Sequence, residues 1–557
     1  MSHSDWDGRL VSVPAERAAR YRATGEWSDA PTSRRLHEVA TRFPRRPAVI
    51  TAEGELSYAD LDARTDQIAA GLIDLGFRRL DPVLFQVTNR MATVLAWYGC
   101  LKAGLVPVAT LAAHRMHEIG HVSRAVGAVG HLVERGLGFD LAGFAREVAA
   151  GHPTLRHVLT IGGDPEPGAP ARIEDVGASI DSGRARAVVE AVEQATDPLD
   201  VAVFQLSGGT TGVPKVIPRI HAEYWNNALF YARHLGWDEH SRVAHLIPLV
   251  HNAGISCALH AAHSVGACLL LATPDARRAF ALMAEHGATE ALFGHGHYQA
   301  LLRPEFDRAR RALRRSVLSG AKVSPELFAR VDDGQSRWAG QMFGMSEGLF
   351  TVSPLDSPAE ARQTTVGVPI APSDEVRILD LSSEDELPAG EVGELCCRGP
   401  YTIAGYFDAP AHNATAFTSD GFYRTGDLAA IRLAGGRRHV VIEGRIKDLI
   451  NRGGEKINAE EVEMLLARHD RITAAAVVAM PDARLGEKTC AYLVSTDETR
   501  LSLTEIQHHL EGLGVAKFKW PERLEWVPAL PRTTVGKVDK KHLRAEVAAK
   551  VTERAAG

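Results

Sequence analysis

The sequence has few cysteines and no long apolar run. Its 557 residues include six cysteines, which form neither a CxxC pair nor a His/Cys cluster with zinc-ligand spacing. No stretch of about 18 apolar residues occurs, and the N-terminal segment lacks the apolar core of a signal peptide. We therefore expect a reduced, cytoplasmic protein with no membrane partner.

The chain also lacks an excess of positive charge. Its 63 basic and 69 acidic residues give a formal net charge of -6, which argues against a nucleic-acid partner. The composition is instead that of a globular enzyme, with 45% hydrophobic and 24% charged residues. A chain of this length is too long to fold around a single hydrophobic core, so at least two domains are expected.

Short apolar runs alternate with longer amphipathic stretches in the first part of the chain. The apolar run at residues 46–51 is followed by an amphipathic stretch at 58–75 and by a second apolar run at 81–87. This alternation predicts α/β units built on buried, mainly parallel strands. The helix expected over 58–75 stops before Gly76.

The pattern changes in the last third of the chain. From about Gly367, shorter strands and turns predict a β-rich subdomain. After GRIKDLI a small α/β segment begins, with helices expected in AEEVEMLLARH and LTEIQHHLEGL and a strand in AAAVVAM. We place a boundary at Asp448 and expect domains at residues 1–447 and 448–557.

A loop rich in glycine and hydroxyl side chains follows an apolar strand in FQLSGGTTGVPKVIPR. Such a loop can close over phosphate oxygens with N–H and O–H donors, and Lys215 adds a cation. The lysine follows a proline, which differs from the Walker pattern, and a loop of this kind taken alone is more often a plain turn. The loop residues are Ser207, Gly208, Gly209, Thr210, Thr211 and Gly212.

Five motifs together identify a family. In sequence and in order, SGGTTGVPK, FGMSEG, YRTGD, GRIKDLINRGGEKI and PRTTVGKVDKK resemble the adenylate-forming superfamily of acyl-CoA synthetases, peptide-synthetase adenylation domains and luciferases. The resemblance covers nearly the whole chain. It implies ATP and Mg²⁺ as cofactors, and an α/β fold with a large N-terminal domain of stacked mixed sheets, a β-rich subdomain and a small mobile C-terminal α+β domain.

The resemblance assigns the nucleotide-binding residues. Glu347 resembles the family's Mg²⁺-associated acid, a hard oxygen ligand beside the triphosphate, and Ser346 could bond a phosphate oxygen. Asp427 would accept hydrogen bonds from both ribose hydroxyls, and Arg445 would contact the ribose and phosphate end. The residues expected at ATP in these motifs are Gly344, Met345, Ser346, Asp427 and Arg445.

By the same resemblance, Lys537 drives adenylation. Attack of a carboxylate on the α-phosphate brings two anions together, so a positioned cation is the main requirement. Without the resemblance, a solvated basic tail would be the simpler interpretation. Asp448 resembles the hinge about which the small domain rotates, and Gly453 and Gly454 would then line the passage of a thiol arm.

The segment PLVHNAGISCALHAA narrows the substrate class. Relatives that activate amino acids commonly carry an Asp there, whereas aryl-acid ligases carry a His-Asn pair, which this chain has in His251 and Asn252. We count His251 among the catalytic candidates. An uncharged amide suits a hydroxyl or ring nitrogen beside the carboxylate better than an ammonium.

Further pocket positions favour a salicylate-like acid. Cys257 stands where salicylate activators have Cys and dihydroxybenzoate activators have Ser, although it could also be a small buried packing residue. In the aryl-acid ligases that the chain resembles, a Tyr usually stands at the position of Ala253 and a small aliphatic residue at that of Phe350. These differences leave substituted or bicyclic hydroxy-acids as an alternative. Gly320 completes the expected pocket.

The resemblance also implies an acceptor. The product would be an aryl-AMP, and the aryl group would pass to the phosphopantetheine thiol of a separate aryl carrier protein, with free CoA as the competing acceptor. A luciferase-like oxygenase fits the His-Asn pocket poorly. A non-catalytic adenylate-binding protein would be expected to have lost Lys537, Glu347 or Asp427, and all three are present.

Overall fold

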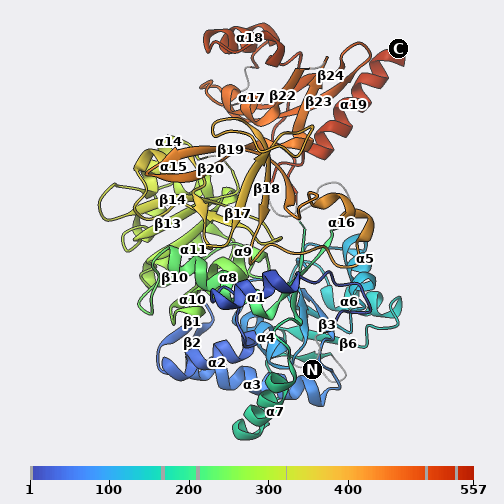
Figure 1. Cartoon of the computed structure of the whole chain (residues 1–557), viewed down its shortest axis with the longest axis vertical. Helices are drawn as coiled ribbons and strands as arrows, with labels where there is room; N and C mark the ends of the chain where they lie inside the picture. Colours follow the sequence, from blue (N-terminus) through green and yellow to red (C-terminus); the bar gives the residue numbers. More distant parts are fainter. Residues whose placement is uncertain are drawn as a thin grey trace.

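The computed structural model describes residues 4–164, 170–207, 214–321, 323–453, 455–495, 500–533 and 537–556. The fold is mixed α/β: two mixed sheets flanked by helices form a large lower body, and a β-rich region and an α+β domain lie above it (Figure 1). No helix in these ranges combines the length and the apolar character needed to cross a bilayer.

The first mixed sheet has the strand order β7-β6-β5-β3-β4-β8-β9, and its pairs are parallel except β8 with β9. Its strands are β3 (Pro82–Gln86), β4 (Val106–Val108), β5 (Gly130–Glu134), β6 (His157–Ile161), β7 (Ala171–Arg172), β8 (Val201–Leu206) and β9 (Val216–Ile220).

The second mixed sheet has the order β16-β15-β14-β13-β12-β10-β11-β1-β2, with parallel pairs from β14 to β1 and antiparallel pairs at both edges. The mainly parallel arrangement predicted from the sequence is confirmed. The strands are β1 (Pro47–Thr51), β2 (Gly54–Ser57), β10 (Arg242–His245), β11 (Cys268–Leu271), β12 (Glu290–Gly294), β13 (Arg315–Ser319), β14 (Trp338–Gly344), β15 (Phe350–Val352) and β16 (Val368–Pro369).

Helices α3, α4 and α8 contribute to the hydrophobic core that joins the two sheets. Helix α3 begins with a capping box at Ser57 and is followed by Gly76, whose φ of 97° suits the end of a helix. The helices of this part are α1 (Ala15–Ala23), α2 (Thr32–Arg42), α3 (Tyr58–Asp74), α4 (Met91–Lys102), α5 (Met116–Val126), α6 (Leu141–Ala150), α7 (Ser182–Ala195), α8 (His221–His234), α9 (Asn252–Gly254), α10 (His260–Ser264), α11 (Ala276–Glu285), α12 (Tyr298–Leu301), α13 (Phe306–Ala309), α14 (Pro325–Val331) and α15 (Ala359–Thr364).

The β-rich region is an antiparallel sheet of order β17-β18-β19-β20, as expected from the pattern of short strands and turns after Gly367. Its elements are β17 (Glu375–Leu379), β18 (Gly393–Arg398), α16 (Pro410–Ala416), β19 (Tyr423–Ala434) and β20 (Arg437–Arg445). Strand β20 leads directly through a short 3-10 turn, Ile446–Asp448, into the last sheet. The turn therefore joins the lower body to the C-terminal domain.

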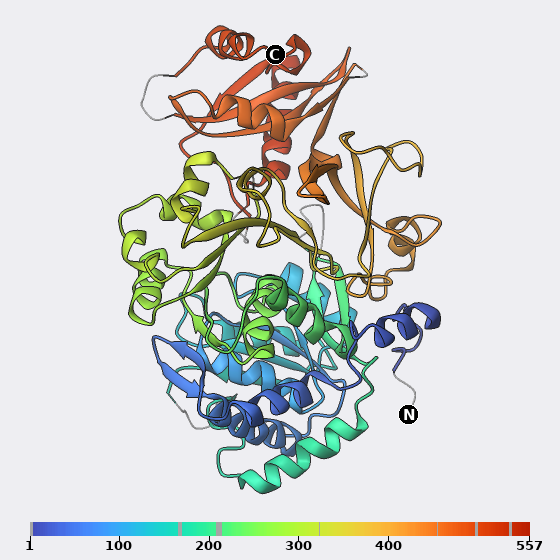
Figure 2. The ribbon, with the colours of Figure 1, turned by 60° about the vertical axis from the view of Figure 1, so that its left-hand side comes forward.

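The C-terminal domain has its own sheet and its own hydrophobic core. Figure 2 shows it above the lower body, and the helices and strand expected in this segment are present. Its elements are β21 (Leu449–Arg452), β22 (Glu455–Asn458), α17 (Ala459–Leu466), β23 (Ile472–Asp482), β24 (Gly486–Ser495), α18 (Leu503–Gly512), β25 (Arg523–Trp526) and α19 (Lys540–Ala556).

Candidate active site

The acidic motif lies in the turn between β14 and β15. Gly344 ends β14, Met345 and Ser346 follow, and the Gly348 N–H donates to the Met345 carbonyl at 3.1 Å. Gly348 has a φ of 128°, and a Cβ placed on it would lie 1.5 Å from the Tyr401 carbonyl oxygen. Only glycine fits there, because both the φ and the close backbone exclude a side chain.

The Glu347 side chain is nearly buried, with 9% of the residue exposed. The Tyr406 hydroxyl donates to Oε1 of Glu347 at 2.6 Å, and the Tyr423 hydroxyl lies 2.7 Å from that of Tyr406. Sequence reasoning missed both tyrosines as site residues. Tyr423 opens the YRTGD motif and Tyr406 stands in GYFD, but the bonds to them connect segments far apart in the chain.

Arg219 supports the same turn from below. It is fully buried in β9, its Nη1 donates to the Ser346 carbonyl at 2.9 Å, and it pairs with Glu223 on α8. The sequence run IPRIHAEY contains both charges, yet nothing in it indicated that the guanidinium reaches across 127 residues of chain to the acidic motif.

Ser207 and Lys215 hold the two ends of the glycine-rich loop together. The Lys215 N–H donates to Ser207 Oγ at 3.0 Å, and the Ser207 N–H donates to the Lys215 carbonyl at 3.0 Å. The Lys215 ammonium lies over the ring of Tyr406, 5.2 Å from its centre. The predicted phosphate-binding residues between them, Gly208, Gly209, Thr210, Thr211 and Gly212, lie outside the described residues.

Asp427 and Arg445 face each other across β19 and β20. Their backbones are register partners, and Arg445 Nε lies 3.0 Å from Asp427 Oδ1. Burial raises the pKa of the Asp427 carboxyl above its usual value, against the opposing charges of Arg445 and Lys537. The sheet register therefore places a carboxylate and a guanidinium side by side, and their contacts with ribose and phosphate stay predictions.

Lys537 approaches Asp427 from the C-terminal domain. Its loop is closed by a 2.7 Å hydrogen bond from the Thr533 N–H to the Lys537 carbonyl, and Arg532 at the loop's base lies 3.5 Å from His295 of the lower body. Loss of hydration and the charge of Arg445 lower the pKa of Lys537 below its usual value. The structure thus brings the C-terminal lysine to Asp427.

His251 caps the short helix α9, where its Nδ1 accepts from the Ala253 N–H at 3.2 Å. His251 is exposed at the surface, and loss of hydration, followed by the charge of Lys537, lowers its pKa to about 4. The imidazole is therefore neutral at physiological pH. The charge of Lys537 thus acts on a residue predicted from a different motif, about 290 positions earlier in the chain.

Asn252 is buried and fully oriented by its neighbours. Its Oδ1 accepts from the Tyr224 hydroxyl at 3.1 Å and from Ser256 Oγ at 3.2 Å, while its Nδ2 donates to the Met345 carbonyl at 3.3 Å. The amide thus links α8 to the acidic motif. Its place in a substrate pocket stays a prediction.

Cys257 and Phe350 belong to one hydrophobic cluster, against which Ala253 packs. Cys257 lies in a π-helical turn, Ile255–Leu259, and burial raises its thiol pKa well above the usual range. The Phe350 ring meets Tyr231 of α8 edge-on at 6.1 Å. Gly320, which was expected in the same pocket, is exposed and has His295 as its nearest neighbour outside the adjacent chain.

Asp448 is held by the C-terminal helix. Arg544 Nη1 of α19 donates to Asp448 Oδ1 at 2.9 Å. Gly453 adopts a φ of 58° and donates its N–H to the Leu485 carbonyl at 2.8 Å, whereas Gly454 lies outside the described residues. These contacts place Gly453 in a turn of the C-terminal domain and leave its predicted role in thiol passage as a proposal.

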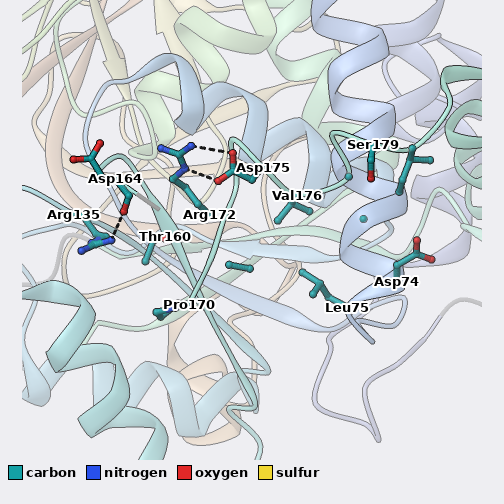
Figure 3. A pocket seen from close by; sticks show the side chains of 14 residues that line it. Asp74, Leu75, Arg135, Thr160, Asp164, Pro170, Arg172, Asp175, Val176 and Ser179 are labelled. Carbon is teal, nitrogen blue, oxygen red and sulfur yellow. Dashed lines mark hydrogen bonds and ion pairs between the residues drawn. The ribbon is translucent and has the colours of Figure 1, made fainter. Parts of the chain in front are cut away.

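A surface cavity of about 450 Å³ lies elsewhere, between the end of α3 and strands β6 and β7 (Figure 3). Its Arg172 side chain forms two hydrogen bonds with Asp175, and none of the predicted site residues lines it. It is therefore separate from the site that contains Glu347 and Lys537.

The comparisons with known proteins decide the family. A model described as "AMP-binding enzyme" matches residues 36–407, and one described as "AMP-binding enzyme C-terminal domain" matches residues 461–537. The chain belongs to the AMP-binding enzyme family. The matched regions contain the glycine-rich loop and Glu347 in the first case and the segment ending at Lys537 in the second.

Relatives within the AMP-binding enzyme family match over almost their whole length. The chain is 39% identical to a salicyl-AMP ligase / salicyl-S-ArCP synthetase of Mycobacterium tuberculosis, covering 96% of this chain and 94% of that one. It is 36% identical to a 2-hydroxy-7-methoxy-5-methyl-1-naphthoate–CoA ligase of Streptomyces carzinostaticus, covering 96% of each. The apo structure of Mycobacterium smegmatis MbtA matches with a TM-score of 0.73 and 37% identity, covering 98% of this chain and 100% of that one.

Proposed function

We propose that this enzyme activates a salicylate-like aromatic acid with ATP and Mg²⁺, forms an aryl-AMP and pyrophosphate, and then transfers the aryl group to a thiol. The observation that carries the proposal is the position of Lys537, whose charge acts on both His251 and Asp427. One cation from the C-terminal domain is thus close enough for its charge to act on one residue of the predicted acid pocket and on one of the predicted ribose site.

Adenylation requires little covalent chemistry from the protein. A carboxylate oxygen of the acid bonds to the α-phosphorus, the bond from that phosphorus to the pyrophosphate oxygen breaks, and pyrophosphate leaves with its electron pair. Lys537 would offset the charge that builds up between the two anions. His251 is neutral at physiological pH, so it adds no positive charge and is suited to orient the acid through a hydrogen bond.

Glu347 fits a magnesium ion held mainly by substrate phosphates. No group of three or more His, Cys, Asp or Glu side chains suited to a metal occurs in the part of the chain that the structure describes. Mg²⁺ in nucleotide enzymes is commonly bound by one or two carboxylates together with phosphates and water. Glu347 would be the protein ligand, and the ion would neutralise charge on the departing pyrophosphate.

The pocket supports an ortho-hydroxy acid as substrate. Asn252 is neutral and buried, and the relatives are a salicyl-AMP ligase and a ligase of a bicyclic hydroxynaphthoate. Cys257 offers a weaker hydrogen-bonding group than the hydroxyl of Ser would, which favours salicylate over 2,3-dihydroxybenzoate. Ala253 and Phe350 change the shape of the slot, so substituted and bicyclic acids belong in the same test.

The acceptor is proposed to be the phosphopantetheine thiol of a separate aryl carrier protein. The thiolate would attack the acyl carbon of the aryl-AMP, and AMP would leave. Rotation of residues 448–557 against 1–447 about Asp448 would remove Lys537 and bring Gly453 and Gly454 to the site. The relatives include both a carrier-loading enzyme and a CoA ligase, so free CoA is the competing acceptor. We place these reactions in the cytoplasm.

ATP–pyrophosphate exchange tests the proposal. The panel contains salicylate, 2,3-dihydroxybenzoate, methylsalicylate and bicyclic hydroxy-acids, and we expect exchange with at least one monohydroxy acid. Lys537→Ala should reduce exchange by about three orders of magnitude, while Lys541→Ala, an exposed lysine on α19, should leave it unchanged. Transfer from supplied aryl-AMP should survive in Lys537→Ala.

The alternatives give different results in the same assays. A non-catalytic adenylate-binding protein would show no exchange with any acid, although the folded protein would still bind ATP. Light emission or oxygen consumption from the adenylate would indicate luciferase-like chemistry. Equal loss of exchange and transfer in Lys537→Ala would refute a role confined to adenylation.

A further inference from the structure

A buried chain of three oxygen-bearing side chains runs into the site from the β-rich region. Tyr423 on β19, Tyr406 before α16 and Glu347 are exposed by 6%, 2% and 9%. The distances are 2.7 Å between the two hydroxyls and 2.6 Å from the Tyr406 hydroxyl to Glu347 Oε1. Both lie within the usual range for hydrogen bonds between oxygens, and 2.6 Å is typical of a hydroxyl that donates to a carboxylate.

Counting protons fixes the direction of the chain. Each tyrosine hydroxyl has a single proton to donate. The Tyr406 proton goes to the Glu347 carboxylate, so the Tyr423 hydroxyl must donate to the Tyr406 oxygen.

Tyr406 is itself fixed from several sides. Its N–H donates to Asn413 Oδ1 at 2.8 Å, and its carbonyl accepts from Asn413 Nδ2 at 2.9 Å. The Lys215 ammonium lies 5.2 Å from the centre of one ring face, and the His412 ring packs edge-on at 4.9 Å. The hydroxyl that reaches Glu347 is therefore carried by a ring that has little freedom to move.

Phe407, the next residue, packs the segment that carries Tyr406 against the N-terminal part of the chain. The Phe407 ring lies against Trp6 at 5.6 Å and under the Arg9 guanidinium at 5.0 Å, and the Phe407 N–H donates to the Val216 carbonyl at 3.0 Å. Residues before α1 and the strand after the glycine-rich loop thus hold the segment that carries Tyr406.

The two oxygens of Glu347 consequently differ. Oε1 accepts the Tyr406 hydrogen bond, whereas the described residues make no hydrogen bond to Oε2. Such a carboxylate can offer Oε2 to a cation without breaking any hydrogen bond made by the described residues, and it would have to give up the Tyr406 bond to offer both oxygens. The hydrogen bond also fixes the direction of the free oxygen.

We propose that Tyr406 is a positioning residue that holds Glu347 so that a single carboxylate oxygen serves the Mg²⁺ of Mg·ATP, with Tyr423 supporting Tyr406 from behind. The inference rests on the proposed function and goes beyond it by naming the residues that set how the acid meets the metal. Tyr406 does not touch substrate in this account and acts through Glu347.

Metal affinity in the nucleotide complex tests the proposal. Manganese, a spectroscopic substitute for magnesium, is titrated by electron paramagnetic resonance into full-length protein saturated with α,β-methylene-ATP, which cannot be cleaved at the α-phosphorus. Tyr406→Phe keeps the ring over Lys215 and removes only the hydroxyl, and we expect about tenfold weaker binding of the metal. Tyr423→Phe leaves the bond to Glu347 in place, so a smaller loss of about two- to threefold is expected.

The matched control is Tyr401→Phe. Tyr401 is a buried neighbour whose hydroxyl donates to the Glu26 carbonyl at 3.3 Å and does not reach Glu347. Its loss should leave metal binding unchanged. In a Glu347→Gln background, Tyr406→Phe should have no further effect, because the two residues act as a unit.

Several outcomes overturn the proposal. These are unchanged metal affinity in Tyr406→Phe, an equal loss in Tyr401→Phe, or additive losses in the double variant with Glu347→Gln. If Tyr406→Phe fails to fold, Tyr423→Phe still decides the matter, since unchanged metal affinity there removes the support for the chain. Absence of exchange in the wild-type enzyme would instead contradict the proposed function, which the metal titration does not measure.

Discussion

The buried Arg219 offers a way to separate stability from catalysis. Its Nε and Nη2 donate to the Glu223 carboxylate at 2.7 and 2.6 Å, and its remaining donors reach the carbonyls of Ser346 at 2.9 Å and Tyr401 at 3.3 Å. One guanidinium thus ties α8 to the acidic motif and to the chain that leads to Tyr406. It has no solvent exposure, so its loss is not compensated by water.

Arg219→Met should destabilise the protein strongly. Removing one partner of a buried ion pair typically costs about 3–5 kcal/mol, because the other charge is left unpaired. Here burial already raises the pKa of Glu223, against the effect of Arg219, so without the arginine the carboxyl can take up a proton. That relief places the expected loss near the lower end, at about 3 kcal/mol.

The double variant Arg219→Met/Glu223→Leu should recover most of that stability, to within about 1 kcal/mol of wild type, since apolar residues often replace a buried ion pair at little cost. Activity should not recover with it. The Ser346 carbonyl still lacks its donor, so the acidic motif is held less well and exchange should stay about tenfold reduced.

Urea unfolding followed by tryptophan fluorescence measures the first quantity, with each transition analysed separately because the chain has more than one domain. ATP–pyrophosphate exchange at saturating substrates measures the second. Arg233→Met, an exposed arginine on the same helix, is the control for both. A double variant as unstable as the single one, or one with wild-type exchange, would refute the reasoning.

The remaining predictions concern the pocket, the hinge and pH. Cys257→Ser should shift preference toward 2,3-dihydroxybenzoate about three- to tenfold relative to salicylate, measured as the ratio of kcat/KM values, and an unchanged ratio would leave Cys257 as a packing residue. Arg544→Met removes the half-buried ion pair with Asp448, which should favour the domain orientation seen in the structure by about 1 kcal/mol. The ratio of exchange to thiol transfer should therefore fall about fivefold. No change in that ratio would mean that the pair does not favour this domain orientation. Burial lowers the pKa of His221 and of His263 to about 4, below the usual 6.5, so the unfolded state binds more protons between these values and Tm should drop as pH falls from about 6.5 to 4. A flat Tm in that window would show that these rings are not buried in neutral form.

Local patterns predicted the fold well. The amphipathic stretch at 58–75 forms α3, and the short strands predicted after Gly367 form an antiparallel sheet. The segments after Asp448 form a sheet and helices of their own. These succeed because hydrophobic periodicity and capping act over a few residues. The family motifs likewise led to Glu347 and Asp427.

The supports of the site were not predictable in the same way. The bond from Tyr406 to Glu347 spans 59 residues of sequence, and the one from Arg219 to Ser346 spans 127. Such contacts depend on how sheets stack, which no local pattern encodes. The burial of Phe350 against Tyr231 has the same origin, since it follows from the packing of α8 on β15.

The bonds around Asn252 make it a filter of hydrogen-bond polarity. Both acceptor positions of its Oδ1 are taken by the Tyr224 and Ser256 hydroxyls, and one Nδ2 proton is taken by the Met345 carbonyl. What is left to offer a ligand is a single N–H. A ring oxygen can accept a hydrogen bond from that N–H. An ortho-ammonium or aniline group, which acts as a donor, would instead face the Asn252 N–H, a second donor. In the proposed pocket the side chain would therefore select against amino acids and anthranilate-like acids by the sign of its dipole, without any charge.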